Sequence, residues 1–163
     1  MINIYINIAM VGSVNQVLWN LLTRIKQSGL YDSANKIYLV FNGDRKQLSF
    51  NLVSEKYVII DANPDISKCE FPTLDLISQH CKEEDFNVLY LHTKGISYDD
   101  DKQTENDWID MMLYFLVEQF ELCTEKLNNG IQSVGCNYYD ENLQVRNPPH
   151  FSGNFWWANS SYI

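Results

Sequence analysis

The sequence predicts an α/β fold, in which a central and mostly parallel sheet is flanked by helices. Apolar segments of strand length alternate along the chain with segments of helical periodicity. Residues 86–92 form an apolar run without alternation, which is typical of a parallel strand buried on both faces. With 163 residues, 45% of them hydrophobic, the chain is long enough to bury one sizeable core. We therefore predict a single domain over residues 1–163.

Six strand-like segments and three helices are predicted in order. The strands lie at residues 2–11, 36–44, 56–65, 86–95 and 131–139, and a strand-like segment occupies residues 150–163. The helices lie at residues 12–29, 73–82 and 104–128. One apolar stripe of the last helix comprises Trp108, Met112, Leu116, Phe120, Cys123 and Leu127. This alternation favours short right-handed crossovers between parallel strands.

The ends of the first two helices carry their own signals. Ser13 and Gln16 fit a capping box, in which each side chain bonds a backbone amide at the start of a helix. Gly29 suits the left-handed conformation that ends a helix. Thr73, directly after Pro72, is the predicted cap of the second helix.

Charge and composition exclude several classes of function. The net charge of -9 and the pI near 4.6 exclude a nucleic-acid partner, because such binding needs clustered Lys and Arg. No apolar run approaches the roughly 20 residues of a transmembrane segment, and the first residues lack the basic region of a signal peptide. The four cysteines are widely spaced, without a C-x-x-C pair, which favours reduced core thiols and a cytoplasmic location.

Common nucleotide-binding and hydrolase motifs are missing from the sequence. It contains neither G-x-G-x-x-G after the first strand nor G-x-x-x-x-G-K-[ST], which disfavours a dinucleotide-binding or P-loop protein. It also lacks a G-x-S-x-G nucleophile elbow, so hydrolase chemistry has no candidate nucleophile.

Candidate site residues follow the ends of the strands, because parallel α/β sheets bind ligands beyond the carboxyl ends of their strands. His92 and Lys94 end the most apolar strand and point to the same side, and Gly95 allows a sharp turn. One interpretation is a cation and a hydrogen-bond donor aimed at a phosphate. The other is a histidine bonded to a neighbouring carbonyl and a lysine in solvent. The spacing leaves both open.

Two further clusters allow a functional and a structural interpretation. Asp99, Asp100 and Asp101 offer the oxygen ligands that Mg²⁺ and Mn²⁺ prefer. Consecutive residues rarely converge on one ion, however, which favours a solvated loop before the next helix. Trp156 and Trp157 are adjacent, so at most one faces a carbohydrate site, where its ring would stack on a sugar. The alternative is a strand with one Trp in the core and the other on the opposite face.

Four segments carry a resemblance to a known family: VLYLHTKGIS at 88–97, the pattern Trp108, Met111, Tyr114 and Phe115, VGCNYY at 134–139, and HFSGNFWWANSSYI at 150–163. They resemble small GT-A-type glycosyltransferases of surface-polysaccharide and capsid-glycan assembly, including rhamnan-synthesis-like proteins. The resemblance runs over nearly the whole chain, and HTKG and SGNFWWA are its most specific parts. It implies a Rossmann-like GT-A nucleotide-sugar-binding domain. The implied activity is hexosyl transfer from a UDP- or dTDP-sugar to a glycan or glycoprotein acceptor.

The resemblance also implies roles for individual residues. It assigns catalysis to His92 and Lys94. The donor nucleotide and its diphosphate would be bordered by Ala9, Met10, Val11, Asp61, Asn63, His92, Thr93, Lys94 and Gly95. The sugar and acceptor side would be lined by His150, Gly153, Asn154 and Trp156.

This chain departs from the family at the metal site and at its end. Related folds carry an Asp-x-Asp metal site where this chain has His92 and Lys94, whose positive charge could stabilise the departing diphosphate directly. We expect weak or absent metal dependence and assign no metal ligand; bound Mn²⁺ or Mg²⁺ is the alternative. An inverting transferase needs a general base, and the candidates are Asp61, Asp140, Glu141 and the 99–101 loop. Because the sequence ends at residue 163, we expect further C-terminal elements to be missing. The alternative functions are non-catalytic nucleotide-sugar binding and protein interaction.

Overall fold

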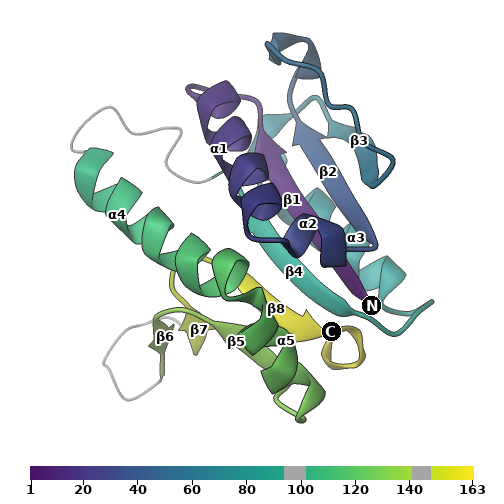
Figure 1. The fold of residues 1–163 in the computed structure, drawn as a ribbon. Coiled ribbons are helices and arrows are strands. Elements are labelled where there is room, and N and C mark those ends of the chain that lie inside the picture. Colours follow the sequence, from purple (N-terminus) through teal and green to yellow (C-terminus); the bar gives the residue numbers. More distant parts are fainter. Residues whose placement is uncertain (94–101, 141–147) are drawn as a thin grey trace.

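The computed structural model describes residues 1–93, 102–140 and 148–163. Its main sheet has the strand order β3-β2-β1-β4-β8-β5, with helices on both faces (Figure 1). The strands are β1 Ile2–Ala9, β2 Lys36–Asn42, β3 Tyr57–Asn63, β4 Asn87–His92, β5 Ser133–Gly135 and β8 Trp156–Asn159. β1 to β4 are mutually parallel, whereas β8 runs antiparallel to both β4 and β5. The predicted α/β class with a mostly parallel central sheet is confirmed.

The helices divide between the two faces of this sheet. They are α1 Val14–Gln27, α2 Leu30–Ser33, α3 Phe71–His80, α4 Lys102–Leu113 and α5 Phe120–Asn128, with short 3₁₀ turns at Arg45–Gln47, Ile66–Lys68 and Ser160–Tyr162. In Figure 1, α1 and α4 lie over one face and α3 lies behind the other. A separate two-stranded sheet pairs β6 Tyr138–Tyr139 with β7 His150–Phe151. None of the described helices has the length and apolar character needed to cross a membrane.

The side chains of β1 are buried on both faces of the sheet, which is why helices are needed on both faces. Ile4, Ile6 and Ile8 belong to the large cluster formed with α1 and α5. Tyr5, which points the other way, packs with Ile77 of α3. The alternation of polar and apolar residues in β1 therefore separates two buried environments, and the polar positions meet hydrogen-bond partners inside.

One of these buried polar groups, Asn7, ties three elements together near the carboxyl ends of the strands. Asn7, only 5% exposed, accepts hydrogen bonds at its Oδ1 from Asn42 Nδ2 at 2.6 Å and from Thr73 Oγ1 at 2.9 Å. Asn42 Nδ2 also donates to the carbonyl of Cys69 at 3.1 Å. A buried amide without partners would cost free energy, so these bonds fix β1, β2 and the start of α3 against one another.

The predicted helix over residues 104–128 is wrong in its continuity. A π-helical turn at Tyr114–Glu118 separates α4 from α5. Within that turn, the carbonyl of Leu116 accepts a hydrogen bond from the indole nitrogen of the fully buried Trp157 at 2.8 Å. A side chain that bonds into the helical ladder is a recognised cause of such a break. The hydrogen bond from Trp157 thus gives a physical reason for the break between α4 and α5. The periodicity of the sequence could not reveal it, because the partner lies far along the chain.

Two predicted helix caps are also wrong. Ser13 precedes α1, but its side chain makes no capping bond, and Gln16 Nε2 instead donates to Asn20 Oδ1 at 2.9 Å. Thr73 lies inside α3, where its hydroxyl serves the buried Asn7, and the residue before the helix is Glu70. Gln16 and Thr73 thus each bond another side chain instead of a backbone amide at the start of a helix.

The glycine predicted to end the first helix is confirmed, because Gly29 takes a φ of +82°. The predicted strand over residues 131–139 is divided. β5 belongs to the main sheet and β6 to the small sheet, and Asn137 between them has a φ of +52°. This left-handed residue turns the chain away from the main sheet.

Thr73→Val removes one donor to Asn7 while keeping the shape of the side chain. We expect the free energy of unfolding to fall by about 1 kcal/mol, because one buried hydrogen bond is lost while Asn42 still serves the acceptor. Equilibrium unfolding in urea measures this change. The control Thr104→Val, at an exposed position of α4, should change stability by less than about 0.5 kcal/mol. Equal losses in the two variants would contradict the role of the buried bond.

Candidate functional site

The carboxyl ends of β1 to β4 meet at one edge of the main sheet and are linked there by hydrogen bonds. The amide of Ala9 donates to Thr93 Oγ1 at 3.1 Å, and the amide of Thr93 donates to the carbonyl of Asn7 at 3.0 Å. The amide of Gly43 donates to the carbonyl of Asn63 at 2.7 Å. Residues that were predicted to border the donor nucleotide thus lie at the ends of three separate strands, along one side of the sheet. We call this side the carboxyl edge.

Met10 and Val11 follow β1 at this edge. The Met10 side chain is buried in the main core, so only its backbone can border a ligand. A Cβ atom on Gly43 would come within 2.9 Å of the Met10 Cβ, and Gly43 has a φ of +105°. Close packing and backbone conformation therefore both require glycine after β2. Val11 is half-buried.

His92, at the end of β4, has contacts with two other segments. Its Nε2 lies 3.1 Å from the carbonyl of Gly153 and 3.9 Å from Glu70 Oε1. A carbonyl can only accept a hydrogen bond, so Nε2 carries the proton. The ring also packs edge-on against Phe155, with a centroid distance of 5.0 Å. His92 is thus held with a donor nitrogen directed at a carbonyl and a carboxylate.

Glu70, just before α3, connects His92 to a wider network. Its Oε2 accepts hydrogen bonds from the Tyr90 hydroxyl at 2.7 Å and from Asn154 Nδ2. Asn154 Oδ1 accepts from the Trp156 indole at 3.2 Å, and the Trp156 ring stacks on Tyr90. Burial, and secondarily the Glu70 carboxylate, raises the pKa of Tyr90, which therefore remains a hydrogen-bond donor at neutral pH.

The turn before β8 adopts the backbone conformation that this network needs. Gly153 and Asn154 both have positive φ, at +92° and +55°. A Cβ atom on Gly153 would lie 2.4 Å from the sulfur of the buried Met112, so that side chain would have to shift, and the positive φ itself favours glycine. Asparagine tolerates the left-handed region better than most residues. Here both polar atoms of the Asn154 side chain are hydrogen-bonded, Nδ2 to Glu70 and Oδ1 to Trp156.

Asp61 and Asn63 border a separate cavity of about 500 Å³ at the ends of β2 and β3. Arg45 binds both carboxylate oxygens of Asp61, at 2.6 and 2.9 Å. This hydrogen-bonded guanidinium lowers the pKa of Asp61, which is therefore ionised at neutral pH and a poor general base. Asn63 Oδ1 accepts from the amide of Asp65 at 2.8 Å.

The structure brings some of the predicted site residues together and leaves others apart. His92, Gly153, Asn154 and Trp156 form one group, and Trp157 points to the core on the other face. His150 lies in the small sheet, where its ring stacks on Tyr139. Lys94, Gly95, the 99–101 carboxylates and Glu141 lie outside the described residues.

Glu70 is the member of the group that sequence reasoning missed. It lies in a polar loop, 22 positions before His92, and it joins no motif in the sequence. A carboxylate at the start of a helix is ordinarily explained by the helix dipole alone. Only the tertiary contacts with Tyr90 and Asn154 distinguish it.

The described residues contain no ready metal centre. Within residues 1–93, 102–140 and 148–163, no three His, Cys, Asp or Glu side chains come together in a way that could hold an ion. The expectations about Mn²⁺ or Mg²⁺ therefore stay predictions.

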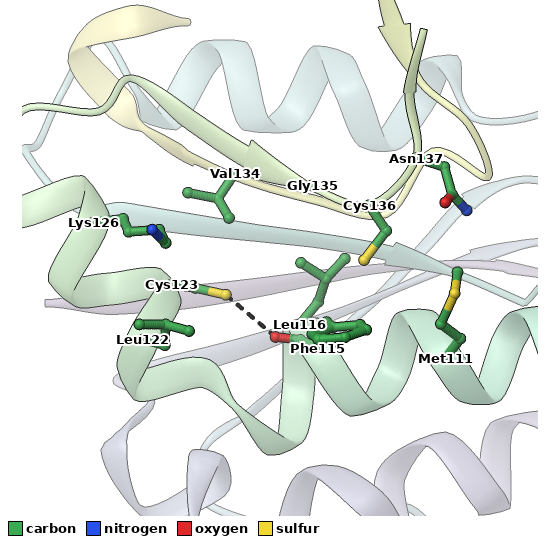
Figure 2. A pocket seen from close by; sticks show the side chains of 10 residues that line it. All are labelled: Met111, Phe115, Leu116, Leu122, Cys123, Lys126, Val134, Gly135, Cys136 and Asn137. Carbon is green, nitrogen blue, oxygen red and sulfur yellow. Dashed lines mark hydrogen bonds between the residues drawn. The ribbon is translucent and has the colours of Figure 1, made fainter.

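A cavity of about 290 Å³ lies away from the carboxyl edge, between the π turn, α5 and β5 (Figure 2). Its lining is mainly apolar, with Phe115 and Leu122 among its residues, and it includes the thiols of Cys123 and Cys136. Cys123 Sγ donates to the carbonyl of Phe115 at 3.4 Å. Burial, and then the neighbouring Cys136, raises the pKa of Cys123 to about 11. These thiols are protonated at neutral pH and are not activated nucleophiles.

Comparison with known proteins gives a family but no activity. One family model, described as a domain of unknown function (DUF8361), matches residues 2–163. None of the curated proteins matches this chain.

The raised pKa of Cys123 predicts a low rate of alkylation. At pH 8 only on the order of a thousandth of this thiol is ionised, and the thiolate is the reactive form. We expect iodoacetamide to label the exposed Cys69 first and Cys123 last, with Cys123 labelling rising as the pH approaches 11. Peptide mass spectrometry over time measures both rates, with urea-unfolded protein as the control. Equal rates at Cys69 and Cys123 in the folded protein would contradict the prediction.

Proposed function

This chain belongs to the DUF8361 family, whose description names no activity. We propose that it is a glycosyltransferase that uses a nucleoside diphosphate-sugar donor. The observation that supports this most directly is the group formed by His92, Gly153, Asn154 and Trp156 at the carboxyl edge. These residues come from the two segments with the most specific resemblance to GT-A enzymes. They meet where parallel α/β sheets bind ligands.

The donor would lie along the carboxyl edge. The cavity beside Arg45 and Asp61, of about 500 Å³, falls within the range of about 300–1,000 Å³ for small-ligand sites and would take the base and ribose. Asp61, although paired with Arg45, keeps lone pairs that can accept from ribose hydroxyls. The diphosphate would then lie over the ends of β1 and β4, beside His92. UDP- and dTDP-sugars both suit this placement.

Transfer breaks the bond between the anomeric carbon and the oxygen of the β-phosphate, and the acceptor oxygen bonds to that carbon. The acceptor proton passes to a base, and the leaving diphosphate gains negative charge. We assign the stabilisation of that charge to His92 and to Lys94, two positions later in the sequence. The carboxylate of Glu70, 3.9 Å from His92 Nε2, and the carbonyl of Gly153, 3.1 Å from the same nitrogen, fix the orientation of the imidazole ring.

Isothermal titration with UDP and with a panel of UDP- and dTDP-sugars tests donor binding. We expect micromolar to millimolar affinity for at least one nucleotide, and His92→Ala should weaken it about fivefold or more because a charge-assisted contact is lost. Glu70→Gln should weaken binding less, since it alters a neighbour that orients His92 and leaves the imidazole in place. The control Asn128→Ala, at an exposed position of α5, should bind nucleotide like the wild type. Absence of binding to every nucleotide at millimolar concentration would overturn the proposal and favour a protein-interaction domain.

Metal dependence is tested with the same donors in excess chelator. If His92 and Lys94 supply the positive charge, hydrolysis or transfer of the donor sugar should retain most of its rate in EDTA. Product formation followed by chromatography measures the rate. Complete loss that Mn²⁺ restores would show that a metal ion is needed after all. Nucleotide binding without turnover under any condition would instead favour a non-catalytic binding module.

A further inference from the structure

A cleft of about 690 Å³ is lined mainly by residues of α1 and α4. These two helices lie on the face of the sheet opposite α3 (Figure 1). This volume is within the range of about 300–1,000 Å³ for ligand sites. His92 and Phe155 are among its lining residues, so the cleft adjoins the carboxyl edge. It shares His92 with the group that contains Glu70 and Gly153, but its other walls are formed by the two helices.

The polar lining of the cleft consists mainly of uncharged groups. It includes Ser13, Gln16, Asn20, Thr23, Gln103 and Asn106. Hydroxyl and carboxamide side chains can each donate and accept hydrogen bonds, which matches the two-way bonding of sugar hydroxyls. Two hydrogen bonds hold some of them in place. Gln16 Nε2 donates to Asn20 Oδ1 at 2.9 Å, and Gln103 Nε2 donates to Asp107 Oδ1 at 2.7 Å.

The cleft also offers an aromatic surface. Trp19 of α1 lines it and is 56% exposed, although large apolar side chains are usually buried. Its ring packs against the ring of Phe50 at 5.3 Å, in a near-perpendicular arrangement. This contact restrains the ring without covering it. An exposed flat ring next to amides suits a ligand with one apolar face and many hydroxyls.

Charges along the cleft disfavour an anionic ligand. Arg24 pairs with both Asp110 and Glu118, so its charge is already offset by two carboxylates. Asp107 adds a further negative charge to the lining. With a net charge of -9, the whole chain adds long-range repulsion toward phosphorylated or acidic polymers.

We propose that this cleft binds an uncharged oligosaccharide, the acceptor of the transfer described above, and this inference rests on that proposed function. Trp19 stacks on one sugar ring, and Asn20 and Asn106 bond hydroxyls from opposite walls. His92, common to the cleft and the carboxyl edge, marks the end of the cleft at which acceptor and donor meet.

Titrations followed by NMR of the ¹⁵N-labelled chain test this site without requiring turnover. The probes are the neutral trisaccharides maltotriose, cellotriose, mannotriose and triacetylchitotriose, with trigalacturonic acid and trilysine as charged probes. We expect at least one neutral trisaccharide to shift the Trp19 indole signal, assigned with Trp19→Phe. Asn20→Ala and Asn106→Ala should each raise the dissociation constant about fivefold or more. The matched control Asn128→Ala, an exposed helical asparagine of α5, should leave it unchanged.

UDP added to the same samples separates this inference from the proposed function. Neutral sugars that fail to shift Trp19 while UDP binds would overturn the cleft as an acceptor site and leave the transferase proposal standing. Stronger binding of trigalacturonic acid or trilysine would overturn the assignment to an uncharged glycan. Failure of both sugar and UDP would overturn both proposals. Sugar binding that Asn20→Ala and Asn106→Ala weaken, and Asn128→Ala does not, supports the site.

Discussion

The antiparallel pairing of β8 with β4 is the contact on which the candidate site depends. Its register sets Trp156 opposite Tyr90 and Trp157 opposite Leu89. Gly153, 61 residues after His92, is thereby brought to its ring. A shift of one residue would exchange the two tryptophans between the core and the α3 face, which the buried bond from Trp157 to the π turn opposes. Core packing on one face thus fixes the site on the other.

Local patterns in the sequence predicted most of the elements. For example, the apolar character of residues 86–92 indicates by itself a strand that is buried on both faces. They did not predict the π turn or the true role of Thr73, since both depend on partners distant in the chain: Trp157 and Asn7. The same limit applies to the site. His92 could be identified from the sequence because it ends a strand. Glu70 could be identified as a site residue only from its contacts in the folded structure.

The acidic composition of the chain opposes the proposed anionic donor, but two carboxylates at the carboxyl edge are held in hydrogen bonds. Asp61 is bound through both oxygens by Arg45. Glu70 accepts from Tyr90 and Asn154 and lies close to His92. Carboxylates that are hydrogen-bonded and paired repel an incoming phosphate less than free ones. On the proposed function, local pairing at this edge therefore lessens the repulsion that the net charge exerts on a diphosphate.

The two faces of the sheet differ in a way that suits a two-substrate reaction. The α3 face carries the network of Glu70, Tyr90 and Trp156, in which Tyr90 donates to Glu70 and stacks on Trp156. The opposite face carries the cleft between α1 and α4, whose amides are exposed and can bond a ligand. His92 lies where the two meet. On the proposed function, the side with the hydrogen-bonded network holds the group that acts on the donor, and the open side receives the acceptor. Preorganisation is needed most where charge develops, so this division agrees with the proposed transfer.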